Sequence, residues 1–319
     1  MIQAKITVIH NRGGEQISDP GEGKERSMSA VSDEIRKRFK EGDDIRDAGL
    51  TTPADVVRYD DIQYGEDPKW QVMDLYRPRF AEGAVLPVIF SIHGGAWVYG
   101  DKERYQYYCM SLAERGFAVL NFTYRLSPEF QFPAPLEDAA LVVKWMVEHA
   151  AEYGLDTKNV FAVGDSAGGH LLGLFSEIKT NPDYAAEFNF TLPDFSLRAV
   201  ALNCGSYTPG RNSEGETEDL MKDFLPEGGT DAEIDRINVL KHVTPDFPPA
   251  FVMTAVEDFL KEDALKIAQV FAVSDVPFVL RIYGDRDTRL GHVFHCNMKL
   301  AEGKKCNDDE CDFFREYLG

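Results

Sequence analysis

The 319-residue sequence contains no stretch of about 18 uninterrupted apolar residues, which is the length that a membrane-spanning helix needs. Its first ten residues, Met1 to His10, lack the separate basic region, the long apolar stretch and the cleavage site of a secretory signal. We therefore expect a cytoplasmic protein with no membrane partner.

Basic charge is also scarce. The chain has 34 lysines and arginines against 54 acidic residues, so its formal net charge is −20. A surface of this sign repels phosphate backbones and anionic lipid headgroups. We expect no nucleic-acid partner.

The number of cysteines is odd, and they are scattered along the chain. Both features argue against a disulfide framework. They are Cys109, Cys204, Cys296, Cys306 and Cys311. Cys306 and Cys311 are close in sequence, but they lack a second close pair or a His-x3-His partner that would complete a zinc site. We expect reduced thiols, no metal and no organic cofactor.

From Leu86 onward, near-continuous apolar runs alternate with helical segments, which is typical of parallel strands covered on both faces. An antiparallel hairpin, formed by residues 56–64 and 71–76, is expected to precede them. The pattern predicts an α/β fold with a mostly parallel, doubly wound sheet. The expected parallel strands are 88–92, 118–122, 160–163, 199–202, 250–254 and 278–282, and the expected helices are 104–115, 136–152, 167–178 and 262–272.

No linker divides the chain, so we expect one domain over residues 1–319. Residues 1–50 are polar apart from a helix at about 29–39, and we expect this segment to pack on the body or on a lid. The connection 205–246 is too long for a plain crossover and predicts a lid-like insertion. Residues 309–318 are expected to form a closing helix.

The segment Gly164-Asp165-Ser166-Ala167-Gly168 joins an expected strand to an expected helix. In such an elbow the serine is held on a tight turn with its hydroxyl exposed, and the glycines avoid collisions with neighbouring backbone. A serine that only caps the helix is the alternative. The glycines and the preceding strand favour Ser166 as a nucleophile.

Ligands collect at the carboxyl ends of parallel strands, so the partners of Ser166 are expected in the loops that follow the other strands. The loop after residues 88–92 carries Gly94, Gly95 and Ala96, whose small side chains leave the backbone amides bare. Together with the amide of Ala167, these groups could stabilise an oxyanion.

A serine nucleophile needs a histidine base that a carboxylate orients. Asp258 follows the strand 250–254, and His292 follows the strand 278–282. The chain order Ser166, Asp258, His292 is the one expected for an α/β-hydrolase arrangement. Other residues remain open for the acid and the base; these are Glu257, Asp263, Asp285 and Asp287 for the acid, and His295 for the base.

These motifs resemble those of the bacterial hormone-sensitive-lipase-like esterases and their carbohydrate-esterase-like relatives, which are α/β-hydrolases. The resemblance extends from about Leu75 to the carboxy terminus. It rests on the segments 93–97, 124–129, 132–134 with Asp138, and 164–169, and on two spacings, Asp258 with Leu260 and His292 with Phe294. By motif position, it implies that Ser166, Asp258 and His292 are the nucleophile, the acid and the base.

The resemblance implies a serine esterase that acts through an acyl-enzyme on small or short-acyl esters, such as acetyl esters of sugars. Ala96 stands where the family has a third glycine, and its methyl group would narrow the acyl side. Trp97, Tyr99 and Tyr207 are candidates to line the pocket, although ordinary packing is equally compatible with each. An amidase or peptidase, a non-catalytic binding protein, and a homodimer all remain open.

Overall fold

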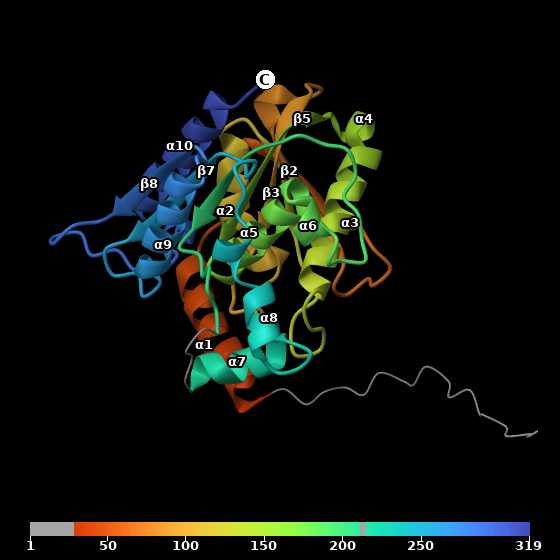
Figure 1. Ribbon diagram of the computed structural model, residues 1–319. Helices are drawn as coiled ribbons and strands as arrows, with labels where there is room; N and C mark the ends of the chain where they lie inside the picture. Colours follow the sequence, from red (N-terminus) through yellow and green to blue (C-terminus); the bar gives the residue numbers. More distant parts are fainter. Residues whose placement is uncertain (1–28, 211–214) are drawn as a thin grey trace, which may run out of the picture.

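The computed structural model describes residues 29–210 and 215–319. These residues form an eight-stranded sheet with helices on both faces (Figure 1). Of the segment expected to pack on the body or on a lid, residues 1–28 lie outside the described residues, as do residues 211–214 of the expected lid-like insertion.

The sheet has the strand order β1-β2-β4-β3-β5-β6-β7-β8. The first two strands form the expected hairpin, β2 is antiparallel to β4, and every other pairing is parallel. The predicted fold class is therefore confirmed. The strands are β1 Val56–Gln63, β2 Val72–Pro78, β3 Leu86–Ile92, β4 Ala118–Phe122, β5 Leu155–Asp165, β6 Leu197–Asn203, β7 Ala250–Ala255 and β8 Phe278–Tyr283.

The apolar strands bury both of their faces because successive side chains point to opposite sides of the sheet. In β3, Val88 and Phe90 belong to one hydrophobic core, while Ile89 between them belongs to the other. The first core packs against α3, α5 and α9, and the second packs against α2 and α10. The helices are α1 Ala30–Asp47, α2 Lys102–Glu114, α3 Ala134–Glu148, α4 Ala150–Tyr153, α5 Ala167–Thr180, α6 Pro182–Ala185, α7 Glu216–Phe224, α8 Asp231–Arg236, α9 Lys261–Val273 and α10 Ala301–Glu316, with short 3-10 turns η1 Arg79–Ala81, η2 Val239–Lys241 and η3 Phe294–Cys296.

Two helices are longer than the sequence predicted. The apolar positions of α1 end at Phe39, but the helix continues to Asp47 through polar residues that pair with one another, such as Lys40 with Asp44. Similarly, α10 begins at Ala301 rather than near residue 309.

Helices α1, α7 and α8 lie together at one edge of the sheet (Figure 1), and we call these three helices the cap. Helix α1 contacts α7, and its Ile35 is buried in the core. The insertion 205–246 thus contributes α7 and α8 to the cap, and the N-terminal part of the described chain contributes α1. No helix in the described parts of the chain is long and apolar enough to cross a membrane.

Candidate active site

Ser166 lies in the turn between β5 and α5. Its backbone has φ 52° and ψ −118°, a conformation that costs a residue other than glycine about 1–3 kcal/mol. Neighbouring glycines make the turn sterically possible: a Cβ on Gly164 would lie 2.5 Å from the carbonyl oxygen of Gly168, and one on Gly168 would lie 2.0 Å from that of Ile92. The turn presents the side chain of Ser166 to a cavity at the edge of the sheet.

The loop after β3 contributes backbone donors to the same cavity. Gly95 has φ 114°, and a Cβ there would lie 2.1 Å from the carbonyl oxygen of Tyr99, so only glycine fits. Ala96 follows with φ 53°. Gly95, Ala96 and Ala167 all line the cavity with Ser166, and no hydrogen bond within the described residues engages their amides.

The backbone amide of Gly94 makes a hydrogen bond, unlike the amides of Gly95 and Ala96, although the sequence predicted all three as oxyanion donors. Its amide donates to the hydroxyl of Tyr105 at 3.0 Å, and that hydroxyl donates to Asp165 Oδ2 at 2.8 Å. A Cβ on Gly94 would lie 2.6 Å from the same carboxylate oxygen. The amide of Gly94 is therefore committed to holding the loop against the serine turn, and it is not a free donor.

Asp258 and His292 are brought together from the loops that follow β7 and β8. His292 Nδ1 lies 2.7 Å from Asp258 Oδ1. The amide of Leu260 donates to the same carboxylate at 2.9 Å, and the hydroxyl of Thr254 does so at 2.8 Å. Burial alone would raise the pKa of Asp258, but these hydrogen bonds outweigh it and hold the pKa below its usual value.

The rival acids are engaged elsewhere. Glu257 forms an ion pair with Arg289, and Asp263 accepts from a backbone amide and pairs with a lysine. Asp285 accepts the backbone amides two and three residues further on, at 2.8 and 2.7 Å, and Asp287 is exposed in that turn. Among the acids weighed from the sequence, the structure joins only Asp258 to the histidine at the cavity.

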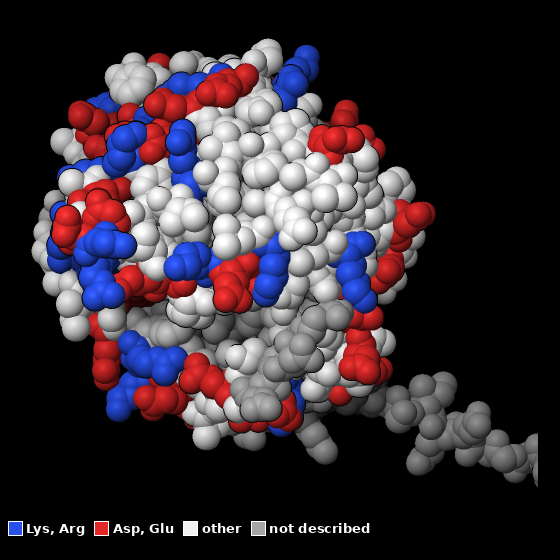
Figure 2. Space-filling view, turned by 60° about the vertical axis from the view of Figure 1, so that its left-hand side comes forward, with Lys and Arg blue, Asp and Glu red and all other residues white. Residues whose placement is uncertain are grey.

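The cavity has a volume of about 550 Å³, which is within the range of small-molecule sites. In Figure 2 a hollow opens between the cap and the body, and acidic and basic side chains surround it. The lining combines parts of the cap with parts of the body. From the cap come Arg38, Phe39, Gly42, Asp43, Arg46, Glu216, Thr217 and Leu220, and from the body come Gly95, Ala96, Trp97, Tyr99, Tyr105, Asp165, Ser166, Ala167, Ser206, Pro209, Phe259, Leu260, His292 and Val293.

Two of the three aromatic residues that we considered for the pocket line it. These are Trp97 and Tyr99. Trp97 Nε1 donates to His170 Nδ1 at 3.1 Å, which fixes the orientation of the indole. Tyr207 is completely buried and lies outside the lining, because its ring packs against the backbone of Gly205.

Sequence reasoning missed several residues of the lining. Asp43 and Arg46 belong to the polar end of α1, Leu220 to α7, and Phe259 directly follows Asp258. The apolar spacing of α1 predicted that Phe39 packs inward, but not that it faces this cavity. This side of the cavity forms where α1 packs against α7, and the apolar spacing alone does not predict that contact.

Comparison with known proteins agrees with this geometry. Residues 73–260, more than half of the chain, match the model of the BD-FAE family. The chain belongs to the BD-FAE family. The esterase resemblance stated from the motifs is confirmed.

Its relatives among curated proteins are named as esterases. Esterase LipC of Mycobacterium tuberculosis is 30% identical over 208 residues, which cover 62% of this chain and 50% of LipC. Esterase LipI of the same organism is 28% identical over 214 residues, which cover 63% of this chain and 64% of LipI. The BD-FAE protein thus spans between half and two thirds of the length of these relatives.

A solved structure matches over most of both chains. Esterase B from Lactobacillus rhamnosis superimposes with a TM-score of 0.82 and 26% identity, covering 90% of this chain and 95% of that one. A further structure of the same esterase is described as inhibited by a C4-C4 SN3 tributyrin phosphonate. The fold of the BD-FAE protein is therefore that of α/β-hydrolase esterases.

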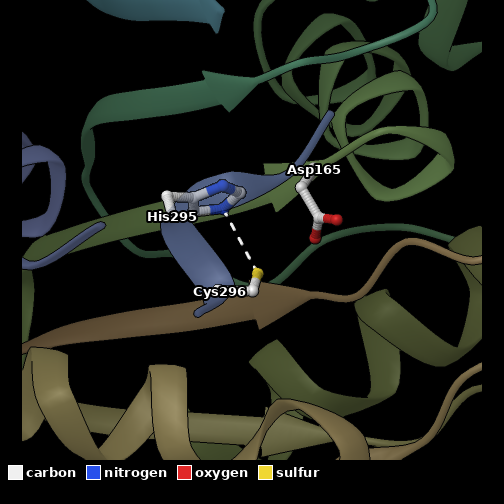
Figure 3. Close-up of side chains that lie close together, drawn as sticks. All are labelled: Asp165, His295 and Cys296. Carbon is white, nitrogen blue, oxygen red and sulfur yellow. Dashed lines mark hydrogen bonds between the residues drawn. The ribbon is translucent and has the colours of Figure 1, made fainter. Parts of the chain in front are cut away.

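His295, the rival base, lies away from the substrate cavity. It is buried beside Cys296 and Asp165 (Figure 3), and burial lowers its pKa to about 3. Its Nε2 lies 3.5 Å from Cys296 Sγ. The structure thus separates the two histidines: His292 opens on the cavity, and His295 packs behind the serine turn.

Within residues 29–210 and 215–319, two groups of side chains could offer ligands to a metal ion. The donor atoms of Asp165, His295 and Cys296 lie within 4.8 Å of one another, a nitrogen, oxygen and sulfur set of the kind that Zn²⁺ accepts. The positive charge of Arg46 acts on all three groups, and it opposes a second cation there. The other group is Cys204 with Asp258 and His292, so it overlaps the acid–histidine pair.

Proposed function

We propose that this protein is a serine carboxylic-ester hydrolase. The observation that carries the proposal is the hydrogen-bonded pair of Asp258 and His292, which opens on the cavity that holds Ser166. The free amides of Gly95 and Ala96 border the same cavity. The names of the curated relatives and the esterase structures support the same chemistry.

In the first half of the reaction, His292 Nε2 accepts the proton of the Ser166 hydroxyl while Oγ attacks the ester carbonyl carbon. The carbonyl oxygen becomes an oxyanion, which the amides of Gly95, Ala96 and Ala167 hold. Losing one such donor typically costs about 3 kcal/mol. Because its pKa is held low, Asp258 stays ionised and stabilises the imidazolium.

His292 then donates its proton to the oxygen of the leaving alcohol, and the tetrahedral intermediate collapses to an acyl-enzyme on Ser166. Water, activated by the same histidine, releases the carboxylic acid. No hydrogen bond within the described residues joins Ser166 to His292 in the free protein. Such catalytic hydrogen bonds commonly tighten only when substrate binds.

We infer that the substrates are short-acyl esters, whose acyl and alcohol parts both fit within the cavity of about 550 Å³. The methyl group of Ala96 in the oxyanion loop narrows the space further. The tributyrin phosphonate bound by esterase B and the name of the versiconal hemiacetal acetate esterase from Dothistroma septosporum are compatible with short acyl groups. Acetyl esters of sugars fall within this range.

The proposal is tested by steady-state kinetics on matched ester and amide substrates that carry the same acyl group. We expect turnover of acetyl and butyryl esters, a decline with longer acyl chains, and little turnover of the amides. Turnover of the amides alone would favour an amidase or a peptidase. A folded protein that turns over neither set would favour a non-catalytic binding protein.

A further inference from the structure

Phe259 is a large apolar side chain exposed at the mouth of the candidate active site. It lies between Asp258 and Leu260 in the loop from β7 to α9, and 76% of its surface is accessible to solvent. Its ring centroid lies 4.4 Å from that of His292, with an angle of 43° between the ring planes. Phe259 also belongs to the lining of the cavity.

Exposing a phenylalanine ring to water is unfavourable, because burying such a side chain gains free energy. Phe259 contacts the histidine over one part of its ring and leaves the remainder open. The nearby lining continues this apolar surface through Leu260 and Val293. An unsatisfied apolar surface at a concave site is typical of a place where a ligand completes the packing.

The chemistry of the proposed reaction decides which part of the ester reaches this surface. His292 must donate a proton to the oxygen of the leaving alcohol, so that oxygen comes within hydrogen-bonding distance of the imidazole. The acyl carbon is held at Ser166 and the oxyanion amides instead. The group attached to the leaving oxygen therefore lies beside the imidazole, next to the tilted ring of Phe259.

We infer that Phe259 forms the subsite for the alcohol portion of the ester, and that this subsite favours an alcohol that presents the face of a ring. The inference rests on the proposed function. A ring face matches the flat, open surface of Phe259, and contact between ring faces adds to simple burial. Both an aromatic alcohol and the apolar face of a sugar ring offer this shape.

A different role for Phe259 would be to hold the imidazole of His292 in place. The two roles have different consequences. A residue that only orients the base affects alkyl esters at least as much as aryl esters, because the poorer leaving group depends more on the proton from His292. A residue of the alcohol subsite instead affects only esters whose alcohol reaches it. Esters with a common acyl group separate the roles, because they all pass through the same acyl-enzyme.

The experiment compares the wild type with Phe259→Ala and Phe259→Leu on three acetate esters: ethyl acetate, phenyl acetate and an acetylated methyl glycoside. Phe80→Ala is the matched control, because Phe80 is 75% exposed but lies in η1, outside the cavity lining. The thermal unfolding midpoint of each variant is measured alongside kcat/KM.

We expect Phe259→Ala to lower kcat/KM for phenyl acetate about three- to ten-fold more than for ethyl acetate. The selective loss in Phe259→Leu should be smaller than that in Phe259→Ala, and the Phe80→Ala control should match the wild type. A comparable selective loss on the glycoside would identify a general ring subsite, and no such loss would restrict it to aromatic alcohols. Rates for the acyl-enzyme hydrolysis step should not change.

Equal losses on all three esters, or a larger loss on ethyl acetate, would overturn the inference and leave only an orienting role. Unchanged kinetics in both Phe259 variants would also overturn it, while the proposed esterase function would stand. If the folded wild type hydrolyses none of the esters, the proposed function fails, and the inference fails with it. The wild-type rates therefore distinguish failure of the function from failure of the subsite.

Discussion

The contacts that fix the candidate catalytic groups in the body differ from those that attach the cap to the body. In the body, the buried side chain of Asp258 is fixed by hydrogen bonds with His292, Leu260 and Thr254. The cap meets the body through buried apolar side chains such as Ile35 and Phe224, and through partly exposed ion pairs such as that of Arg36 with Glu129. The body thus fixes the groups that we propose for chemistry, while the cap shapes the space around the substrate.

This contrast implies that changes in the body alter the chemical steps, and that changes in the cap alter substrate binding. Buried hydrogen bonds are costly to break, because the remaining partner loses its compensation. Exposed ion pairs contribute about 0–1 kcal/mol each and weaken with salt. The four variants below probe this difference, from the largest expected effect to the smallest.

Replacing Ser166 with alanine should have the largest effect. Without the nucleophile, turnover of a short-acyl ester should fall by about four to six orders of magnitude. The backbone hydrogen bonds of the turn do not involve the side chain, so the unfolding temperature should stay close to that of the wild type. Ester hydrolysis rates and thermal unfolding check both expectations, and substantial residual turnover would remove Ser166 from the mechanism.

Asp258→Asn should cost about three to four orders of magnitude in kcat, since an amide cannot hold the correct imidazole tautomer or stabilise its charge. Asp285→Asn is the matched control, because Asp285 accepts backbone amides in an exposed turn. The control should retain wild-type kcat. If Asp285→Asn were inactive and Asp258→Asn active, the acid would be wrongly assigned.

Tyr105→Phe should lower kcat about ten- to hundred-fold, because the oxyanion loop loses its tie to Asp165 while the free donors remain. The control is Tyr107→Phe, which removes a hydroxyl of the same helix that donates to the carbonyl of Leu50 at 2.9 Å, away from the cavity. KM should change little in either variant. Equal kcat values in the two variants would show that the Gly94 contact does not position the loop.

A change in the cap should act mainly on binding. Arg36 donates to the carbonyl oxygens of Val98 and Ser127 at 2.7 and 2.8 Å, and it pairs with Glu129. We expect Arg36→Ala to raise KM about three- to ten-fold with nearly unchanged kcat, because these contacts tie α1 to the loops after β3 and β4, while Tyr105 still holds Gly94 in the oxyanion loop.

Lys40→Ala is the control for the cap, since Lys40 pairs with Asp44 of the same helix and both side chains are about half exposed. It should leave KM within about two-fold of the wild type. If Arg36→Ala lowered kcat and left KM unchanged, the cap would take part in the chemical step, and the division between cap and body would not hold.

The body was predictable from the sequence to a large extent. The apolar runs gave the strands because both faces of a parallel sheet are buried, and the order of Ser166, Asp258 and His292 followed from the loops after those strands. The pairing of His292 with Asp258, rather than with Asp285 in its own loop, followed the same logic.

The cap and the finer roles of the loop residues were not predictable. The link from Gly94 to Tyr105 depends on how α2 packs across the sheet, and a motif does not encode that orientation. Polar residues extend α1 beyond its apolar face, so Asp43 and Arg46 carried no signal of a cavity wall. Tyr207 looked equally suited to the pocket and to the core, and burial in the structure decided between them.

The central claim is that Ser166 is a nucleophile activated by His292, and covalent labelling tests it most directly. The folded wild type is incubated with a fluorophosphonate, and the adduct is located by mass spectrometry of the intact protein and of its peptides. We predict one adduct, on Ser166, that forms far more slowly in His292→Ala and not at all in Ser166→Ala. A folded wild type that gains no adduct, or that gains it on another residue, would contradict the account.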